Sequence, residues 1–270
     1  MTVFQAFILG ILQGLAEFLP ISSSAHLTLA PWAFGWEDPG LSFDVALHIG
    51  TLVALLWYFR AEWAKLARAA LAVASQGGKP KTVEERRVVY LILATIPGGI
   101  AGVLLEKKAE TVFRSPLLIA GTLAVMGVVL WAVDRYSARD RPLATMRWQD
   151  ALLIGIAQIL ALVPGVSRSG STITAGRALR FSREDAAVFS FVLSMPLIAG
   201  AGLLKVPHLL REGITAPLVV GVVTAALSSW FSIAVVLRYV RNHSYGVFAA
   251  YRLLLAAAVV TLVVVRGHGG

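Results

Sequence analysis

The sequence predicts an all-α membrane protein with about six membrane-spanning helices and two re-entrant helical hairpins, arranged as an inverted-topology repeat. Three observations lead to this fold class. The 270 residues are 57% hydrophobic and only 14% charged, whereas about a quarter of the residues in a typical soluble domain are charged. Long runs contain no charged side chain. Two further apolar stretches are interrupted near the middle by proline, glycine and polar residues.

The uncharged runs predict the spans in order along the chain. A helix needs about 20 residues to cross the hydrocarbon core of a bilayer, and each run has about this length. No Asp, Glu, Lys or Arg occurs in residues 88–105, 115–133, 186–204 and 213–237. Residues 42–59 and 247–265 complete the set of expected membrane spans. We therefore expect a multi-pass membrane protein with a single integral membrane domain, residues 1–270.

Basic residues between the spans predict the orientation. Residues 60–87 contain seven Lys or Arg, residues 134–147 contain four Arg, and Arg238 and Arg241 mark a third basic turn. Cytoplasmic loops carry an excess of Lys and Arg, so we expect all three segments in the cytoplasm of a cell whose inner (plasma) membrane holds the protein. This distribution also argues against nucleic-acid binding, although the net charge is +9.

Residues 3–36 and 149–180 do not fit single spans. With the basic loops inside, each stretch must begin and end on the same side of the membrane. Both are broken near the middle, at Pro20 and at Pro164, so we interpret each as two half-helices joined by a turn. Non-helical backbone at membrane depth is tolerated only where protein or a water-filled cavity surrounds it. The first hairpin is expected to enter from outside and the second from the cytoplasm.

Opposite entry of the two hairpins implies two inverted halves, approximately residues 1–135 and 145–270. The sequence supports this weakly, because residues 9–16 align with residues 154–161 and a proline and a serine-rich stretch follow each segment. Inverted repeats whose broken helices meet at the midplane are typical of secondary transporters. The architecture alone therefore slightly favours transport over chemistry.

The first hairpin contains an acidic and hydroxyl-rich segment. Gln13 and Glu17 are four residues apart and share a helix face, where they could bind a cation or position a water molecule. A carboxylate inside the membrane is costly and usually functional, although backbone amides or nearby serines could satisfy Glu17 structurally. The three serines that begin at Ser22 exceed what helix capping needs. His26 could act as a general acid or base, but one histidine alone counts for little.

The second hairpin offers a guanidinium group among hydroxyls. Ser167, Arg168 and Ser169 lie at its turn, and Thr172 follows one helical turn later. Arginine presents a rigid fork of donors that matches phosphate oxygens, and half-helix N-termini also favour anions. The alternative, a structural ion pair between Arg168 and Glu17, is compatible with such a site. A phosphate-bearing lipid is the natural ligand, because its tail stays in the bilayer while its head group enters the site.

These segments resemble the undecaprenyl-diphosphate phosphatase (bacitracin-resistance) family of bacterial inner membranes over nearly the whole chain. The two main motifs are residues 13–27 and 164–173, and residues 43–51 and 250–252 support them. The resemblance implies hydrolysis of undecaprenyl diphosphate to the monophosphate carrier lipid and inorganic phosphate. This reaction recycles the lipid for peptidoglycan synthesis and confers bacitracin resistance.

The resemblance also implies roles for particular residues. Catalytic roles fall to Glu17, Ser23, His26 and Arg168, and substrate binding to Gln13, Ser22, Ser167, Ser169 and Thr172. A divalent cation, Mg²⁺ or Ca²⁺, would bind Glu17, with Gln13 as a second candidate ligand. Some family members have Glu at the position of Gln13, which weakens the case for two carboxylate ligands. Attack by Ser23 and attack by an activated water molecule both stay open.

Two other classes of function compete with hydrolysis. A polyprenyl-phosphate lipid transporter could use the same midplane phosphate site, and a proton-coupled channel or antiporter could use Glu17. Phosphate release in detergent discriminates, because transport needs two compartments and hydrolysis needs none. We expect the site cavity to face outward, since the first hairpin enters from outside. The expected partners are the lipid substrate and bilayer lipids, and the small residues 98–102 suit close helix packing within or between subunits of a homo-oligomer.

Overall fold

The described part of the chain, residues 1–111 and 115–267 of a computed structural model, consists of helices and the segments that connect them. Within it no β-strand forms, and the only extended pairing is an isolated bridge between Arg141 and Phe181. Short 3-10 helices, η1 (Leu143–Thr145) and η2 (Leu160–Leu162), lie in the connections. The predicted all-α fold class is confirmed.

Six of the described helices are long and apolar enough to cross a membrane. They are α3 (Gly40–Tyr58), α5 (Val83–Thr111), α6 (Pro116–Tyr136), α9 (Arg183–Glu212), α10 (Ala216–Asn242) and α11 (Gly246–Gly267). Each contains most of one predicted span, so the predicted number is confirmed. Uncharged runs identify these helices because only helices satisfy their own backbone groups in lipid.

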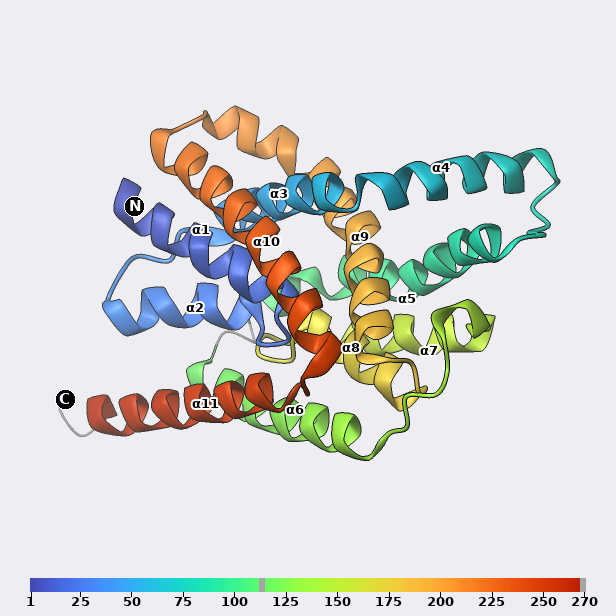
Figure 1. The fold of residues 1–270 in the computed structure, drawn as a ribbon. Coiled ribbons are helices and arrows are strands. Elements are labelled where there is room, and N and C mark those ends of the chain that lie inside the picture. Colours follow the sequence, from blue (N-terminus) through green and yellow to red (C-terminus); the bar gives the residue numbers. More distant parts are fainter. Residues whose placement is uncertain (112–114, 268–270) are drawn as a thin grey trace.

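The basic segment after the first span is not simply a loop. α3 ends at Tyr58, and a second helix, α4 (Arg60–Ser75), begins after a break at Phe59. Its buried residues Leu66 and Ala69 pack against the start of α5, and its charged residues lie on the other faces. In Figure 1, α4 and the start of α5 project together beyond the other helices. An amphipathic helix carries charged residues on its polar face. Uncharged runs alone therefore do not predict α4.

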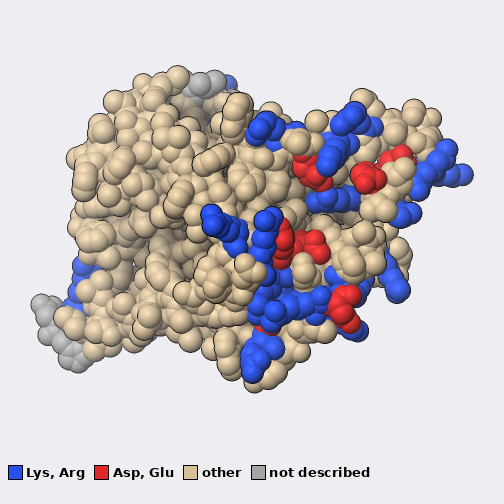
Figure 2. Space-filling view, in the orientation of Figure 1, with Lys and Arg blue, Asp and Glu red and all other residues tan. Residues whose placement is uncertain are grey.

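Charged side chains gather at the end of the molecule from which α4 and α5 project. Figure 2 shows this end rich in Lys, Arg, Asp and Glu, whereas most of the rest of the visible face carries none. The three predicted basic segments therefore meet at one end. An excess of Lys and Arg at one end is the pattern of a cytoplasmic surface.

Two pairs of short helices approach the centre of the molecule from opposite ends (Figure 1). The first pair is α1 (Val3–Phe18) and α2 (Ser23–Phe34), joined by a turn at residues 19–22. The second pair is α7 (Trp148–Ile159) and α8 (Arg168–Ala178), joined by η2 and residues 163–167. This is the form expected of the two hairpins. Their re-entry into a membrane stays a prediction, since length and composition alone define the spans.

Helix packing in one half of the chain has a counterpart in the other. α1 packs along α10 as α7 packs along α5, while α3 packs against α9 and α6 against α11. Glycines permit the close contacts of both first half-helices. A Cβ atom added at Gly10 would lie 2.6 Å from the Gly221 carbonyl oxygen of α10, and one at Gly155 would lie 2.5 Å from the Ala94 carbonyl oxygen of α5. Inverted halves would produce this pairing.

A buried ionic network holds the second hairpin at the charged end. Asp134 of α6 accepts hydrogen bonds from Arg177 of α8 at 3.0 Å and from Arg183 of α9 at 2.7 Å. It also accepts one from the backbone amide of Tyr245 at 3.0 Å. Breaking a buried ion pair by removing one partner costs about 3–5 kcal/mol. The network therefore fixes α8 relative to α6, α9 and the start of α11.

Candidate functional site

The turns of the two hairpins contact each other directly. The Ser22 hydroxyl accepts a hydrogen bond from the backbone amide of Gly165 at 3.2 Å. In the opposite direction, the Ser169 hydroxyl donates to the carbonyl oxygen of Leu19 at 3.1 Å. Each turn thus satisfies backbone groups of the other that helix termination leaves without partners. These contacts bring the start of α2 and the start of α8 together.

Arg252 of α11 holds both turns at once. Its side chain is fully buried and donates to the carbonyl oxygens of Pro20 at 3.0 Å, Gly165 at 2.7 Å and Val166 at 3.1 Å. The Nε atom donates to the Leu123 carbonyl oxygen of α6 at 3.2 Å. A guanidinium group has five donors in a fixed fork, so one side chain serves carbonyls from three segments. Arg252 therefore sets the relative position of the two turns.

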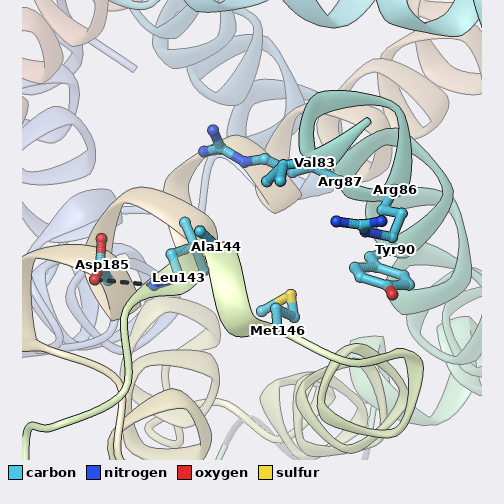
Figure 3. Close-up of a pocket in the computed structure, with 8 residues that line it drawn as sticks. All are labelled: Val83, Arg86, Arg87, Tyr90, Leu143, Ala144, Met146 and Asp185. Carbon is cyan, nitrogen blue, oxygen red and sulfur yellow. Dashed lines mark hydrogen bonds between the residues drawn. The ribbon is translucent and has the colours of Figure 1, made fainter. Parts of the chain in front are cut away.

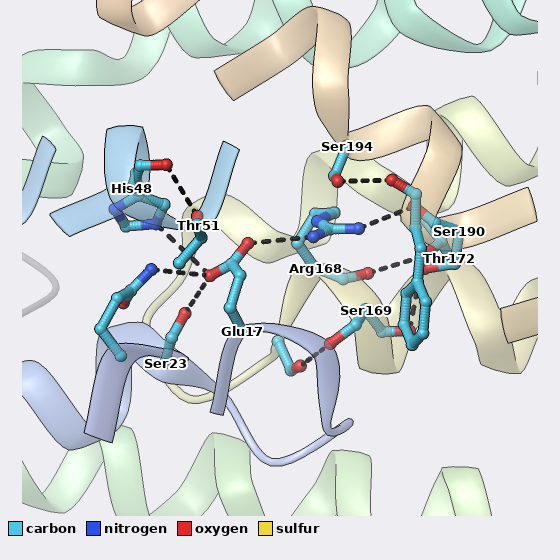
Figure 4. Close-up of polar contacts among 12 residues, drawn as sticks. Glu17, Ser23, His48, Thr51, Arg168, Ser169, Thr172, Ser190 and Ser194 are labelled. Atoms are coloured by element: carbon cyan, nitrogen blue, oxygen red, sulfur yellow. Dashed lines mark hydrogen bonds and ion pairs between the residues drawn. The ribbon is translucent and has the colours of Figure 1, made fainter. Parts of the chain in front are cut away.

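Glu17, at the end of α1, lies at the centre of a polar cluster (Figure 4). Its Oε1 atom accepts a hydrogen bond from Arg168 at 2.9 Å. Its Oε2 atom accepts from Ser23 at 2.6 Å and from Gln13 at 3.2 Å, and the His48 Nε2 atom lies 3.4 Å away. Donors from α1, α2, α3 and α8 thus converge on one buried carboxylate.

Arg168 begins α8 and spans the gap between α1 and α9. Its Nη1 atom donates to the carbonyl oxygen of Ser190 at 2.8 Å, while Nη2 reaches Glu17. The Thr172 hydroxyl accepts from or donates to the Ser190 hydroxyl at 2.6 Å, and donates to the Arg168 carbonyl oxygen at 2.8 Å. The ion pair between Arg168 and Glu17, the alternative expected from the sequence, is therefore formed. Its guanidinium group is oriented by bonds on two sides.

A cavity of about 250 Å³ lies against this cluster. Its polar wall consists of Glu17, Ser23, Ser24, His48, Ser167, Arg168 and Ser194. Its apolar wall includes Val45 of α3 and Leu197, Ile198 and Ala201 of α9. A ligand with an anionic head and an apolar tail matches such a cavity, because charge-assisted hydrogen bonds meet the head and apolar side chains meet the tail.

The predicted catalytic histidine, His26, is not brought to Glu17. Its Nδ1 atom faces the Ser22 carbonyl oxygen at 2.8 Å, and its Nε2 atom lies 2.7 Å from the Tyr251 hydroxyl. A carbonyl oxygen only accepts, so Nδ1 carries the hydrogen, and in the neutral ring Nε2 accepts from the tyrosine. His26 is buried and does not line the cavity. His48 is the histidine that contacts Glu17 instead.

Of the five residues predicted to bind substrate, only Ser167 lines the cavity. The other four, Gln13, Ser22, Ser169 and Thr172, are buried behind the polar wall. Their hydrogen bonds hold Glu17, the two turns and Arg168 in place. The structure thus places them as supports of the groups that a ligand would touch.

Several groups that the fold brings together have no role that the sequence predicts. His48 and Arg252 lie within the two supporting segments, but neither was singled out. Ser190 and Ser194 of α9 lie in an uncharged run that predicted only a span. A histidine inside an apolar run was the signal that could have identified His48, because ionisable residues in spans are usually functional.

Comparison with known proteins identifies the family. The model of the bacitracin resistance protein BacA family matches residues 6–258. The chain belongs to the BacA family. The match includes the turns of both hairpins, α3 and Arg252, so every residue of the polar cluster lies inside it. The predicted family is confirmed.

Relatives of this BacA-family chain are similar along almost their whole length. An undecaprenyl-diphosphatase of Gemmatimonas aurantiaca is 59% identical over 260 residues, covering 96% of this chain and 97% of the relative. An undecaprenyl-diphosphatase of Moorella thermoacetica is 51% identical, covering 97% and 98% of the two chains. One from Pelotomaculum thermopropionicum is 49% identical over the full length of both. Similarity of this extent spans nearly the whole chain.

The cluster offers few ligands for a metal ion. Among the described residues, no group of three or more His, Asp or Glu is placed to hold one. Glu17 is the only carboxylate on the described cavity wall, and both its oxygens already accept hydrogen bonds. The Gln13 amide oxygen, however, is buried without a hydrogen-bond partner. One carboxylate plus an amide oxygen fits Mg²⁺, which takes few protein ligands and completes its shell with phosphate and water.

A second cavity, of about 260 Å³, lies at the charged end (Figure 3). Arg86 and Arg87 of α5 line one side, and Asp185 lines the other, where it accepts from the Leu143 amide at 3.2 Å. Arg87 is also paired with Glu62 of α4. Carboxylates thus balance the arginines. This cavity has no cluster of hydroxyls and does not share the chemistry of the cavity beside Glu17.

Proposed function

We propose that this BacA-family protein is an undecaprenyl-diphosphate phosphatase, which converts the lipid diphosphate to undecaprenyl phosphate and inorganic phosphate. The names of its relatives support this activity. The observation that carries the proposal is the hydrogen bond of 2.6 Å that the Ser23 hydroxyl donates to Glu17, a buried carboxylate that Arg168 also contacts. The nucleophile Ser23, the base Glu17 and the phosphate-binding guanidinium group of Arg168 then lie side by side on one cavity wall.

Binding of the diphosphate would use charge and backbone dipoles together. Arg168 supplies the planar donor fork that suits phosphate oxygens. The first residues of α2 and α8, Ser23 and Arg168, both line the cavity. The positive ends of two helices therefore border it, and these ends favour an anion. The apolar wall of α3 and α9 would receive the first part of the isoprenyl chain.

Ser23 is the better-placed of the two candidate nucleophiles. Its proton would pass to Glu17 Oε2 while its Oγ atom attacks the terminal phosphorus. The bond from that phosphorus to the bridging oxygen breaks, undecaprenyl phosphate leaves, and water then hydrolyses the phosphoserine. Direct attack by a water molecule activated by Glu17 is the alternative. Trapping of phosphoserine supports the first mechanism, and a fully active Ser23→Ala variant contradicts it.

A divalent cation, Mg²⁺ or Ca²⁺, belongs to the proposal. Glu17 and the unpartnered Gln13 amide oxygen would hold it, together with phosphate oxygens and water. When bound, it would neutralise charge that develops on the phosphoryl oxygens. The chain's own contribution is to hold Glu17 between donors from four elements, so that its carboxylate stays ionised and oriented.

The cavity is proposed to open on the outer face of a bacterial inner membrane, with both hairpins re-entrant. Two placements support this. Val45 and Ala201 of the cavity lining lie toward the ends of α3 and α9 that are farther from the charged end. Labelling of a Ser24→Cys variant in intact cells tests the direction. Reaction with an impermeant reagent from outside is expected, and reaction only from the cytoplasmic side would contradict it.

Phosphate release by the detergent-purified protein tests the function. Undecaprenyl and farnesyl diphosphate are compared, with and without Mg²⁺ or Ca²⁺. Glu17→Gln and Arg168→Ala are expected to abolish release, while Glu84→Gln and Arg238→Ala, which change exposed residues of the same types, retain it. No release by folded wild-type protein would reject hydrolysis and favour the lipid transporter, which the relatives' names do not support.

A further inference from the structure

His48 is a polar side chain in the middle of an apolar span. From residue 45 to residue 56, only His48 and Thr51 of α3 carry polar side chains. The His48 side chain is 31% exposed and lines the cavity with Glu17 and Arg168. A polar group at such a depth is costly and usually functional. The proposed function leaves this side chain without a role.

Each ring nitrogen of His48 faces an acceptor, through a hydrogen bond on one side and an ion-pair contact on the other. Its Nδ1 atom faces the Asp44 carbonyl oxygen at 2.7 Å, and its Nε2 atom faces Glu17 Oε2 at 3.4 Å. Arg168 and Ser23 also donate to Glu17, so its carboxylate is ionised and accepts only. A ring between two acceptors bonds to both only when both nitrogens carry hydrogen. His48 is then an imidazolium ion.

Few other charges surround this ring. Glu17 of α1 and Arg168 of α8 share the cavity with it, and Asp44 is the neighbouring acid on α3 itself. α9 and α10 also pack against α3, but their residues 186–204 and 216–237 contain no Asp, Glu, Lys, Arg or His. Two cations and one carboxylate therefore line the cavity. An anionic ligand would balance the excess positive charge.

We infer that His48 binds an oxygen of the substrate's diphosphate beside Arg168. The inference rests on the proposed function, because it names a further substrate-binding residue of the same site. Bound diphosphate replaces Glu17 as the acceptor for the Nε2 hydrogen. Glu17 Oε2 loses one donor and becomes a stronger base for the Ser23 proton. His48 keeps both hydrogens while Ser23 bonds to the phosphorus and the bridging oxygen leaves with its electron pair.

The first test compares His48→Gln and His48→Ala in the phosphate-release assay. The glutamine amide keeps one donor but carries no charge. Hydrogen bonds to charged groups contribute about 1.5–3 kcal/mol, so kcat/KM is expected to fall about 10–100-fold in His48→Gln and further in His48→Ala. Part of the loss is expected as a rise in KM. His243→Gln is the matched control, because His243 is exposed at the end of α10, and its kcat/KM should not change.

Calorimetric titration with inorganic pyrophosphate separates this inference from the proposed function, since binding needs no turnover. Weaker pyrophosphate binding by folded His48→Gln than by wild type and His243→Gln would support the role of His48 even without phosphate release. Equal pyrophosphate affinity and equal kcat/KM in folded His48→Gln would overturn it. Wild-type protein that neither binds pyrophosphate nor releases phosphate would overturn both proposals. Size-exclusion chromatography and thermal unfolding establish that each variant is folded.

Discussion

Ser22 and Ser167 have nearly the same backbone conformation in two hairpins that approach from opposite ends. Their φ angles are 76° and 75°, and each residue immediately precedes the second helix of its hairpin. Each hydroxyl accepts a hydrogen bond from the amide three residues later, that of Ala25 at 3.4 Å and that of Gly170 at 3.0 Å. Positive φ is uncommon outside glycine. Its occurrence at both turns relates the hairpins more specifically than their apolar patterns do.

Substitution of Ser167 is expected to destabilise the protein more with alanine than with glycine. Alanine removes the hydroxyl that caps Gly170 and retains the strain of positive φ, while glycine removes the cap but adopts this conformation freely. Loss of an N-cap to alanine costs about 0.5–2 kcal/mol, and to glycine a few tenths. Thermal unfolding in detergent measures the order of stability of the two variants. Ser115→Ala is the control, because Ser115 precedes α6 with a φ of −65° and makes no capping bond. Equal stability of Ser167→Ala and Ser167→Gly would contradict strain at this turn.

The spans and the ion pair of the site could be predicted from sequence because each has a local signal. A run without charge predicts a helix that crosses lipid, and Pro20 and Pro164 mark where two helices break. Glu17 and Arg168 were identified because a charge inside an apolar stretch needs a partner or a ligand. Their meeting at 2.9 Å follows from two hairpins whose turns contact each other.

The roles of the two histidines could not be predicted in this way. The direction of His26 depends on the positive φ of Ser22, which sets how α2 leaves the turn, and no sequence pattern reports that angle. His48 reaches Glu17 only because α3 packs beside α1. Arg252 likewise gains its function from carbonyls on distant segments. Tertiary packing decides all three, whereas composition and periodicity describe only single helices.

Gly155→Ala is expected to destabilise the packing of the second hairpin. A Cβ atom at this position would lie 2.5 Å from the carbonyl oxygen and 2.8 Å from the Cα of Ala94, so α7 and α5 must separate. Overpacking of this kind costs about 1–3 kcal/mol. Thermal unfolding is compared with that of Gly121→Ala, where nothing lies within 4 Å of the added Cβ and alanine improves helix propensity. A Gly155→Ala variant as stable as Gly121→Ala would contradict this prediction, because α5 would then move away from α7 with no loss of stability.

Arg252→Lys is expected to lower both stability and phosphate release, although Arg252 does not line the cavity. A lysine ammonium cannot reach the Pro20, Gly165 and Leu123 carbonyls together, and each unsatisfied buried group costs about 1–3 kcal/mol. The two turns then lose their fixed positions. Arg266→Lys is the matched control, since Arg266 also bonds to carbonyl oxygens, those of Trp32 and Ala33, but is exposed. A stable Arg252→Lys variant with wild-type turnover would reject the positioning role.

Arg168→Lys is expected to keep the fold but lose most phosphate release. Lysine retains the charge opposite Glu17, so the buried carboxylate stays paired. It lacks the planar fork that reaches Glu17 and the Ser190 carbonyl together, and the orientation of the cation toward phosphate is lost. Hydrogen bonds to charged groups contribute about 1.5–3 kcal/mol, so kcat/KM should fall about 10–100-fold. Arg180→Lys is the control, because Arg180 pairs with Asp140 on the surface, where ion pairs contribute about 0–1 kcal/mol. If Arg168→Lys retained wild-type kcat/KM, positive charge alone would suffice at this position and the fork would have no part in binding the diphosphate.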